Sequence, residues 1–486
     1  MKTKKQKKIS KEEIIKGFLP NQSYFLISLL ISLIFFWISK DNGMFWDNVL
    51  FASKMGNQLY ENGIFNWTMP DTFDPAQAPF LGFILAVFWK ILGHKLWVSH
   101  IAMVFFKCGF IYQLLLFLDY CKLKKSEVFF GALLVLVDPS VSSTLILVSP
   151  EIIILFSFFL ALNGILKNST YKTLMGCLLL SIISYRSLML FGGLMVFDFL
   201  NQLINTQKSL KEIITLKKTV VYLISLLPAI VFLSWRLLTK GWIYTHPDSP
   251  WGEYSHMVTI SGFLKNCLFL IHRYIDFGRV FICLFITITL LLFRNKISIS
   301  IQQKRLLTLS VTSVIFVLVA VLLSTNPFGH RYFLVSYIFI TLVAYLFLIQ
   351  FKHKRLLYSL LFFGLITGNL WIYPKRISQG WDSTLAHLPY HFLRIETINY
   401  LDHEKIPIKH VASFFPNVTK IDNIDLSGDL REFEKFTKDS EYVFYSNIFN
   451  LTDEEYDILE NEFKEIKRFT NYKIYVSILK SVKKTD

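Results

Sequence analysis

The chain has 486 residues, of which 53% are hydrophobic and 16% aromatic, and its repeated apolar runs of about 17–25 residues exclude a soluble globular protein and indicate a polytopic membrane protein. The net charge of +16 does not indicate nucleic-acid binding, because residues 1–372 hold 35 Lys/Arg against 16 Asp/Glu, giving +19, whereas residues 373–486 hold 16 against 19, giving −3. The positive excess therefore belongs to the membrane part, as the positive-inside rule predicts.

The first predicted span is Gln22–Ser39, which follows a basic segment at residues 1–21 and lacks a small-residue cleavage site, so we interpret it as a retained anchor. Ten further spans complete a helical membrane domain over residues 22–372, at 97–118, 127–138, 150–166, 171–185, 188–204, 217–239, 267–293, 305–324, 331–350 and 355–372. The loops on one side, with the N-terminus, hold 23 of the 35 basic residues. This asymmetry predicts a protein of the cytoplasmic (inner) membrane with a cytosolic N-terminus and with residues 373–486 outside.

Two apolar segments are too short for a comfortable span. Phe80–Leu92, at the end of the long outer loop 40–96, contains Lys90, and we expect it to form a helix lying at the outer membrane surface. The segment 127–138 ends at Asp138-Pro139, and it could be a broken helix that lines a cavity.

Residues 373–486 predict a small extracytoplasmic α/β domain. We expect a helix over Ser383–Leu401, strands at His410–Phe415 and Tyr442–Ser446, a helix from Thr452 to about Phe463, and a final strand over Lys473–Ile478. Thr452 and Glu455 have the spacing of a capping box. The five cysteines lie in or beside apolar runs without zinc-ligand spacing, which predicts neither a disulfide framework nor a structural zinc.

Asp47 is the first candidate catalytic residue, because it follows the first span almost at once and lies where a lipid head group would present itself. A carboxylate there could deprotonate an acceptor hydroxyl, or it could only solvate the end of the span. On the predicted topology nine of the sixteen acids of residues 1–372 lie on this outer face: Asp41, Asp47, Glu61, Asp71, Asp74, Asp138, Glu151, Asp248 and Glu253.

Asp71 and Asp74 lie in a proline-rich run, Met69 to Pro79, which fixes the backbone as a stiff ledge leading into the surface helix. Asp74 could orient an acceptor or, with Asp47, hold a divalent metal ion. The alternative is turn chemistry, because Asp-Pro commonly opens a turn. Glu151, at the outer start of a span, could face Asp47 as a second acid, or it could only complement the helix dipole.

Candidate substrate-binding residues interrupt apolar runs. Tyr185-Arg186 lies between two short spans, where an arginine could bind a lipid phosphate or pair with a loop carboxylate. His330, Arg331 and Tyr332 form a tight outer turn at the start of a span. An aromatic anchor at the membrane interface would explain Tyr332, but it would not explain His330 and Arg331 equally well.

The outer loop Thr239–Asn266 combines aromatic residues, acids and histidines, as suits stacking on a sugar ring. His246 is the residue of this loop that we include among the candidate substrate ligands. An interfacial loop lying in the head groups would have a similar composition.

In the order of these features the chain resembles the GT-C superfamily of membrane glycosyltransferases, and more closely bacterial relatives of protein mannosyltransferases and of the lipid A aminoarabinose transferase. The resemblance covers most of the chain. No single motif in it is specific, but the order of the motifs along the chain is. It rests on Asp47 in the first outer loop, the run Asp74 to Leu81 into a helix ending at Leu92-Gly93, Asp138-Pro139, Ser149-Pro150-Glu151, Tyr185-Arg186, His330-Arg331-Tyr332, and a terminal outer domain. The family commonly has Asp-Glu and His-Pro-Pro where this chain has Asp47-Asn48 and Gln77-Ala78-Pro79.

The resemblance implies transfer of a sugar from a polyprenyl-phosphate carrier, entering from the outer leaflet, to an acceptor glycan, lipid or protein. Asp47 would be the base, the anomeric centre would invert, and Arg186 or Arg331 would hold the lipid phosphate. Two other classes compete with this reading. A transporter or flippase would need internal symmetry, and the sequence has no repeat. A non-catalytic envelope assembly factor would tolerate substitution of Asp47, Asp74 and Arg331 together.

Overall fold

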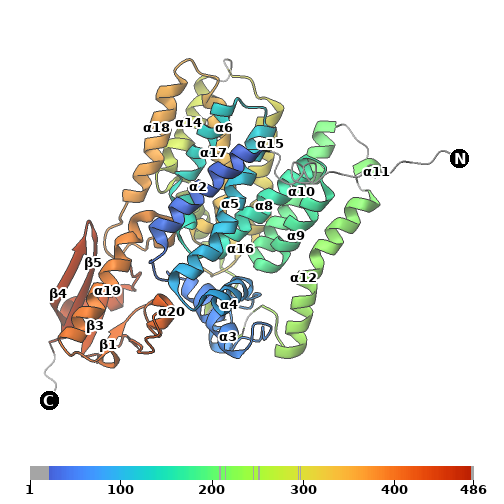
Figure 1. The fold of residues 1–486 in the computed structure, drawn as a ribbon. Coiled ribbons are helices and arrows are strands. Elements are labelled where there is room, and N and C mark those ends of the chain that lie inside the picture. Colours follow the sequence, from blue (N-terminus) through green and yellow to red (C-terminus); the bar gives the residue numbers. More distant parts are fainter. Residues whose placement is uncertain are drawn as a thin grey trace.

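The structure, a computed structural model, describes residues 21–206, 210–213, 215–244, 246–249, 252–254, 256–293, 295 and 297–482. The predicted basic segment 1–21, except for its last residue, and Trp251 of the aromatic loop lie outside these residues. Figure 1 shows a bundle of long helices with a small sheet at one end, beside α3 (Met55–Asn62) and α4 (Phe80–Leu92). The short helix α11 (Leu210–Ile213) lies at the other end (Figure 1).

The predicted spans correspond to helices. The bundle consists of α2 (Gln22–Ser39), α5 (Leu96–Tyr120), α6 (Lys125–Leu136), α7 (Pro139–Ile146), α8 (Pro150–Leu166), α9 (Thr170–Ile183), α10 (Tyr185–Thr206), α12 (Leu216–Lys240), α13 (Ile260–Ile275), α14 (Arg279–Leu292), α15 (Ile301–Thr312), α16 (Ile315–Leu323), α17 (Leu334–Leu348) and α18 (Lys354–Thr367). In the described part of the chain five helices are long and apolar enough to cross a membrane, or up to seven if each of two bent pairs is one span. The chain is an integral membrane protein, and the count of eleven spans stays a prediction.

Two sharp breaks interrupt the bundle. The first lies between α6 and α7, which are bent by 80° at Asp138-Pro139, where the Asp138 carboxylate accepts a hydrogen bond from the Ser140 amide at 2.9 Å. The broken helix predicted here is confirmed. The second break was not predicted: the span predicted at 267–293 is not one continuous helix, because α13 and α14 are bent by 90°. Gly278 turns the chain with a φ of +81°, and a Cβ at this position would collide with the Gly364 carbonyl of α18.

A buried arginine joins the two breaks. Arg279, the first residue of α14, pairs through Nε with Asp138 Oδ2 at 3.0 Å and donates to the Ser140 hydroxyl. Its guanidinium also lies 3.9 Å from the centre of the Tyr337 ring. All four side chains are almost fully buried, so this ion pair is enclosed by its partners and holds both broken helices in one arrangement.

The C-terminal domain is a five-stranded mixed sheet in the order β2-β1-β3-β5-β4, packed on α19 (Leu388–His403). The strands are β1 (Val411–Ser413), β2 (Glu434–Lys435), β3 (Tyr442–Ser446), β4 (Phe463–Asn471) and β5 (Ile474–Ser481). The predicted α/β class and the capping box before α21 (Asp453–Glu462) are confirmed. The predicted helix from Ser383 is wrong in its first residues, because short 3-10 turns precede α19, and β4 was missed.

The loop after α2 is docked into this domain. The Met44 amide donates to the Ile424 carbonyl at 2.8 Å, and the Phe45 ring stacks on His387 with centroids 4.3 Å apart. Phe45 is 1% exposed and belongs to the hydrophobic core of the sheet domain rather than to that of the bundle. The position of the loop that carries Asp47 is therefore set by residues near the end of the chain.

Candidate active site

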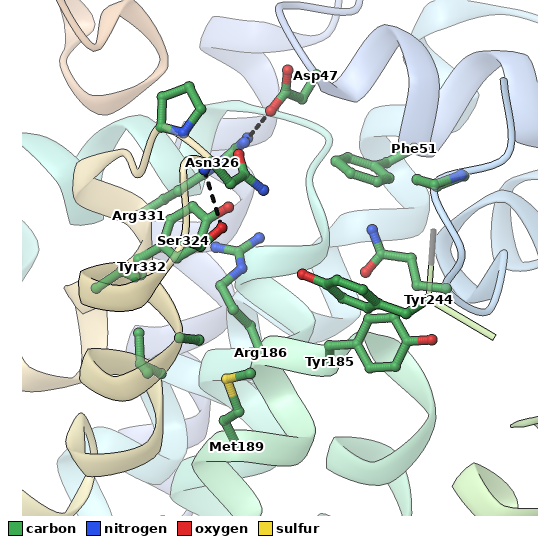
Figure 2. A pocket seen from close by; sticks show the side chains of 16 residues that line it. Asp47, Phe51, Tyr185, Arg186, Met189, Tyr244, Ser324, Asn326, Arg331 and Tyr332 are labelled. Carbon is green, nitrogen blue, oxygen red and sulfur yellow. Dashed lines mark hydrogen bonds and ion pairs between the residues drawn. The ribbon is translucent and has the colours of Figure 1, made fainter. Parts of the chain in front are cut away.

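A cavity of about 160 Å³ lies between the loops around Asp47, Pro75 and Asn326 and the ends of α10 and α16. The apolar wall comes from α16 and from Met189 of α10, and the polar wall comes from loops, from η5 (His330–Phe333) and from Tyr185 and Arg186 at the start of α10. The lining residues are Asp47, Phe51, Pro75, Gln77, Tyr185, Arg186, Met189, Tyr244, Val317, Ala320, Val321, Ser324, Asn326, Pro327, Arg331 and Tyr332. Figure 2 shows Asp47 on one side of this space and Arg186 extending between Tyr332 and the pair Tyr185–Tyr244.

The backbone around Asp47 is built to present its side chain. Trp46 has a φ of +52°, a left-handed conformation that turns the chain out of the loop. The Asp47 carbonyl then accepts hydrogen bonds from the amides of Leu50 and Phe51, both at 3.0 Å, which start the following π-helical turn Val49–Lys54. Because the main chain of Asp47 is held in this way, its carboxylate is free to point to the cavity, where it pairs with Arg331.

Arg331 is the centre of the charged group, because three carboxylates surround it. It pairs with Asp47, its Nη1 lies 3.1 Å from Asp382 Oδ2, and its Nε lies 3.9 Å from Glu151 Oε1. The side chains are 4–14% exposed. Since buried like charges repel each other strongly, the arrangement depends on the shared guanidinium.

Arg186 is the second arginine of the site and has fewer ionic contacts. Its Nη2 pairs with Glu151 Oε1 at 2.7 Å, and its guanidinium lies 4.4 Å from the centre of the Tyr332 ring. The neighbouring Tyr185 donates its hydroxyl to the Ile243 carbonyl at 2.9 Å and packs against Tyr244 with centroids 5.5 Å apart. Arg186 therefore faces the cavity with donors that an anion could use.

Asp382 was not among the residues predicted from the sequence. It lies in the turn Trp381–Ser383, where Ser143 of α7 donates to the Asp382 carbonyl at 2.7 Å. Burial raises the pKa of the Asp382 carboxyl, Arg331 opposes this shift, and Asp47 and Glu151 add to it. The sequence offered one signal for Asp382: it directly follows a tryptophan, as Asp47 does in Trp46-Asp47.

Asp74 and Asp71 do not line the cavity, although Pro75 and Gln77 do. Asp74 is fully buried, its Oδ2 lies 3.0 Å from Arg236 Nη2, and its Oδ1 accepts from the Ala76 amide at 2.9 Å. Asp71 is bound by Lys240, and this hydrogen bond lowers the pKa of the Asp71 carboxyl. Both acids thus anchor the proline-rich run to α12.

His330 and His246 are also outside the cavity lining. His330 is buried and its Nε2 lies 2.8 Å from Asp276 Oδ2, so it ties η5 to the break between α13 and α14. His246 stacks on Trp242 with centroids 5.3 Å apart. Among the residues that the structure describes, no group of three or more His, Cys, Asp and Glu side chains could hold a metal ion.

The Asp74–Arg236 pair gives a first prediction. We expect Asp74→Asn to lower stability by about 3 kcal/mol, because it leaves a buried arginine without its counter-ion. Thermal unfolding in detergent measures this loss, and Asp248→Asn, at an exposed acid of the same face, is the matched control. The sugar transfer that the sequence resemblance implies should stay near wild type per folded molecule. Loss of transfer at unchanged stability would instead support the catalytic role predicted for Asp74 from the sequence.

Comparison with known proteins adds to this geometry. No protein family matches the chain, and no curated protein matches it. Its structure is similar to the crystal structure of ArnT from Cupriavidus metallidurans bound to undecaprenyl phosphate, with a TM-score of 0.51 and 10% sequence identity over 94% of this chain and 98% of that chain. The chain therefore shares the fold of that protein, a relative of which the sequence resemblance had indicated.

Proposed function

We propose that the protein is a membrane glycosyltransferase that moves a sugar from a polyprenyl-phosphate carrier to an acceptor at the outer face of the cytoplasmic membrane. The observation that carries this proposal is the cavity in which Asp47 faces Arg186 beside an apolar wall. Such a transfer needs a carboxylate, a cation with available hydrogen-bond donors and a surface compatible with lipid. The structural neighbour holds undecaprenyl phosphate, a carrier of this class.

The placement of the cavity supports the proposed orientation. The sheet domain, α3 and α4 lie at one end of the bundle, and α11, whose residues belong to the predicted basic loop 208–218, lies at the other (Figure 1). This agrees with an outer side that holds residues 40–96 and 373–486 and with a cytosolic side that holds the basic loops.

In the proposed reaction Asp47 accepts the proton of the acceptor hydroxyl as its oxygen attacks the anomeric carbon. The bond from that carbon to the carrier phosphate breaks, the phosphate leaves with the electron pair, and the anomeric configuration inverts. Arg186 compensates the charge that develops on the phosphate, because among the described residues Glu151 is its one ionic partner, whereas Arg331 is shared among three acids.

The lipid and the sugar fit different walls. Met189 of α10 and Val317, Ala320 and Val321 of α16 offer an apolar surface for the first isoprene units. The rings of Tyr185, Tyr244 and Tyr332 lie at the polar end, where a sugar can stack. The catalytic, binding and orientation roles are parts of this one proposal.

Arg186→Met tests the phosphate role. Because a hydrogen bond to a charged group contributes about 1.5–3 kcal/mol, we expect KM for the lipid donor to rise about 10- to 100-fold. Arg305→Met, at an arginine that bonds Asn201 and Tyr120 at the ends of α10 and α5, is the matched control and should keep the wild-type KM. An unchanged KM in Arg186→Met would contradict the assignment.

Transfer by the purified full-length protein tests the function itself. A panel of radiolabelled polyprenyl-phosphate sugars is offered with a membrane extract as the acceptor source, and wild type is compared with Asp47→Asn. We expect label from at least one donor to reach an acceptor with wild type and not with the variant. No transfer with any donor from folded protein would contradict the proposal and favour a flippase or an assembly factor.

A further inference from the structure

We propose that Asp382, which the C-terminal domain contributes, is a positioning residue of the site and that the site is incomplete without it. This inference rests on the proposed function. Asp382 would act through Arg331, by fixing the plane of the guanidinium that orients the Asp47 carboxylate. The C-terminal domain is then part of the catalytic unit rather than only an appended binding module.

The first support is the geometry of the shared cation. Arg331 has Asp47 at one side and Asp382 at another, with Arg331 Nη1 3.1 Å from Asp382 Oδ2. Glu151 is more distant, at 3.9 Å from Nε, and is already bound by Arg186 at 2.7 Å. Asp382 is therefore the nearest group besides Asp47 itself that restrains the guanidinium.

The second support is how firmly the backbone of Asp382 is anchored, independently of its side chain. The Ser143 hydroxyl donates to the Asp382 carbonyl at 2.7 Å, and the Ser140 hydroxyl donates to the Ser383 carbonyl at 3.2 Å. Ser140 also accepts from Arg279, which joins the two helix breaks. A segment that merely covered the bundle would not need a fixed attachment to both broken helices.

The third support is that the same domain holds the Asp47 loop from the other side. Phe45, two residues before Asp47, is buried against His387, five residues after Asp382. Both the base and its positioning acid are thus held by one short segment, residues 381–387, which precedes α19. Small errors in the position of a reacting group cost large factors in rate, which gives this arrangement a function.

The positioning role predicts a particular kinetic signature. Asp382→Ala should lower kcat at least tenfold and leave KM for the lipid donor within about twofold, because Arg186 and the apolar wall are untouched. Asp382→Asn should lie between the alanine variant and wild type, since its amide oxygen can still accept from Arg331. Asp402→Ala, at an exposed acid of the same domain that pairs with Arg431, is the matched control and should behave as wild type.

Full-length variants in detergent are compared for kcat, KM and thermal unfolding with the donor that wild type uses. The low kcat of Asp382→Ala, its unchanged KM and the partial rescue by asparagine would together support the inference. A wild-type kcat in Asp382→Ala, or a raised KM at unchanged kcat, would overturn it. A loss explained by unfolding, with no rescue by asparagine, would also overturn it. No transfer by wild type would contradict the proposed function instead, so the two failures are distinguishable.

Discussion

Asp47→Asn should lower the transfer rate about 10²- to 10⁴-fold, the range that removal of a positioned general base produces. Asparagine has the same shape and can still accept a hydrogen bond from Arg331, so the variant should fold. It cannot take a proton from the acceptor hydroxyl, and the loss should therefore appear in kcat with little change in donor KM. Single-turnover transfer with a saturating lipid donor measures it.

Asp41→Asn is the matched control for this experiment. Asp41 lies in the same loop, is 78% exposed and pairs with Lys40. Its substitution removes an equal charge six positions earlier and should leave transfer unchanged. Full activity in Asp47→Asn would remove the base from the proposed mechanism and leave Glu151 as the remaining acid of the site that was predicted from the sequence.

Arg331→Met should have the largest effect on stability. Removing one partner of a buried ion pair costs about 3–5 kcal/mol, and here three acids lose the cation they share. We expect a lower thermal unfolding temperature and no measurable transfer. The double variant, in which Asp382→Asn is combined with Arg331→Met, should recover part of the lost stability, because one of the unpaired acids becomes neutral.

Two comparisons make this prediction specific. Arg376→Met removes an exposed arginine that pairs with Asp457 and Glu460 at the surface of the C-terminal domain, and it should change stability little. Arg331→Lys keeps the charge but not the planar fork, so it should be more stable than the methionine variant while transfer stays low. A stable Arg331→Met protein would show that the three acids do not depend on this arginine.

The helical part of the fold was predictable because apolar runs of this length can satisfy their backbone in a bilayer only as helix. The break at Asp138-Pro139 was also predictable, since proline cannot continue a helix. The break at Gly278 was missed although charged residues, Asp276 and Arg279 among them, interrupt the apolar run there, because the turn itself depends on contact with α18. Strand β4 was missed because it is a mostly exposed edge strand with a charged sequence.

For the site, the sequence indicated the outer ends of the helices and there singled out Asp47, Arg186 and Arg331, which the structure brings together. It could not separate these from Asp74 and His330, because all lie on the same predicted face. What separates them is the identity of the buried partner, Arg236 or Asp276, and partners on distant helices leave no local pattern. Asp382 was missed for the same reason.

The charged centre of the site also has an order of assembly. Asp47 is made early in translation, its partner Arg331 comes 284 residues later, and Asp382 follows only after the last helix of the bundle. Until the ribosome has delivered the C-terminal domain, Phe45 has no core to enter and Arg331 lacks one of its acids. A nascent chain that has inserted all its helices is thus still without a complete site. If the protein has the proposed function, transfer begins only when synthesis is almost finished.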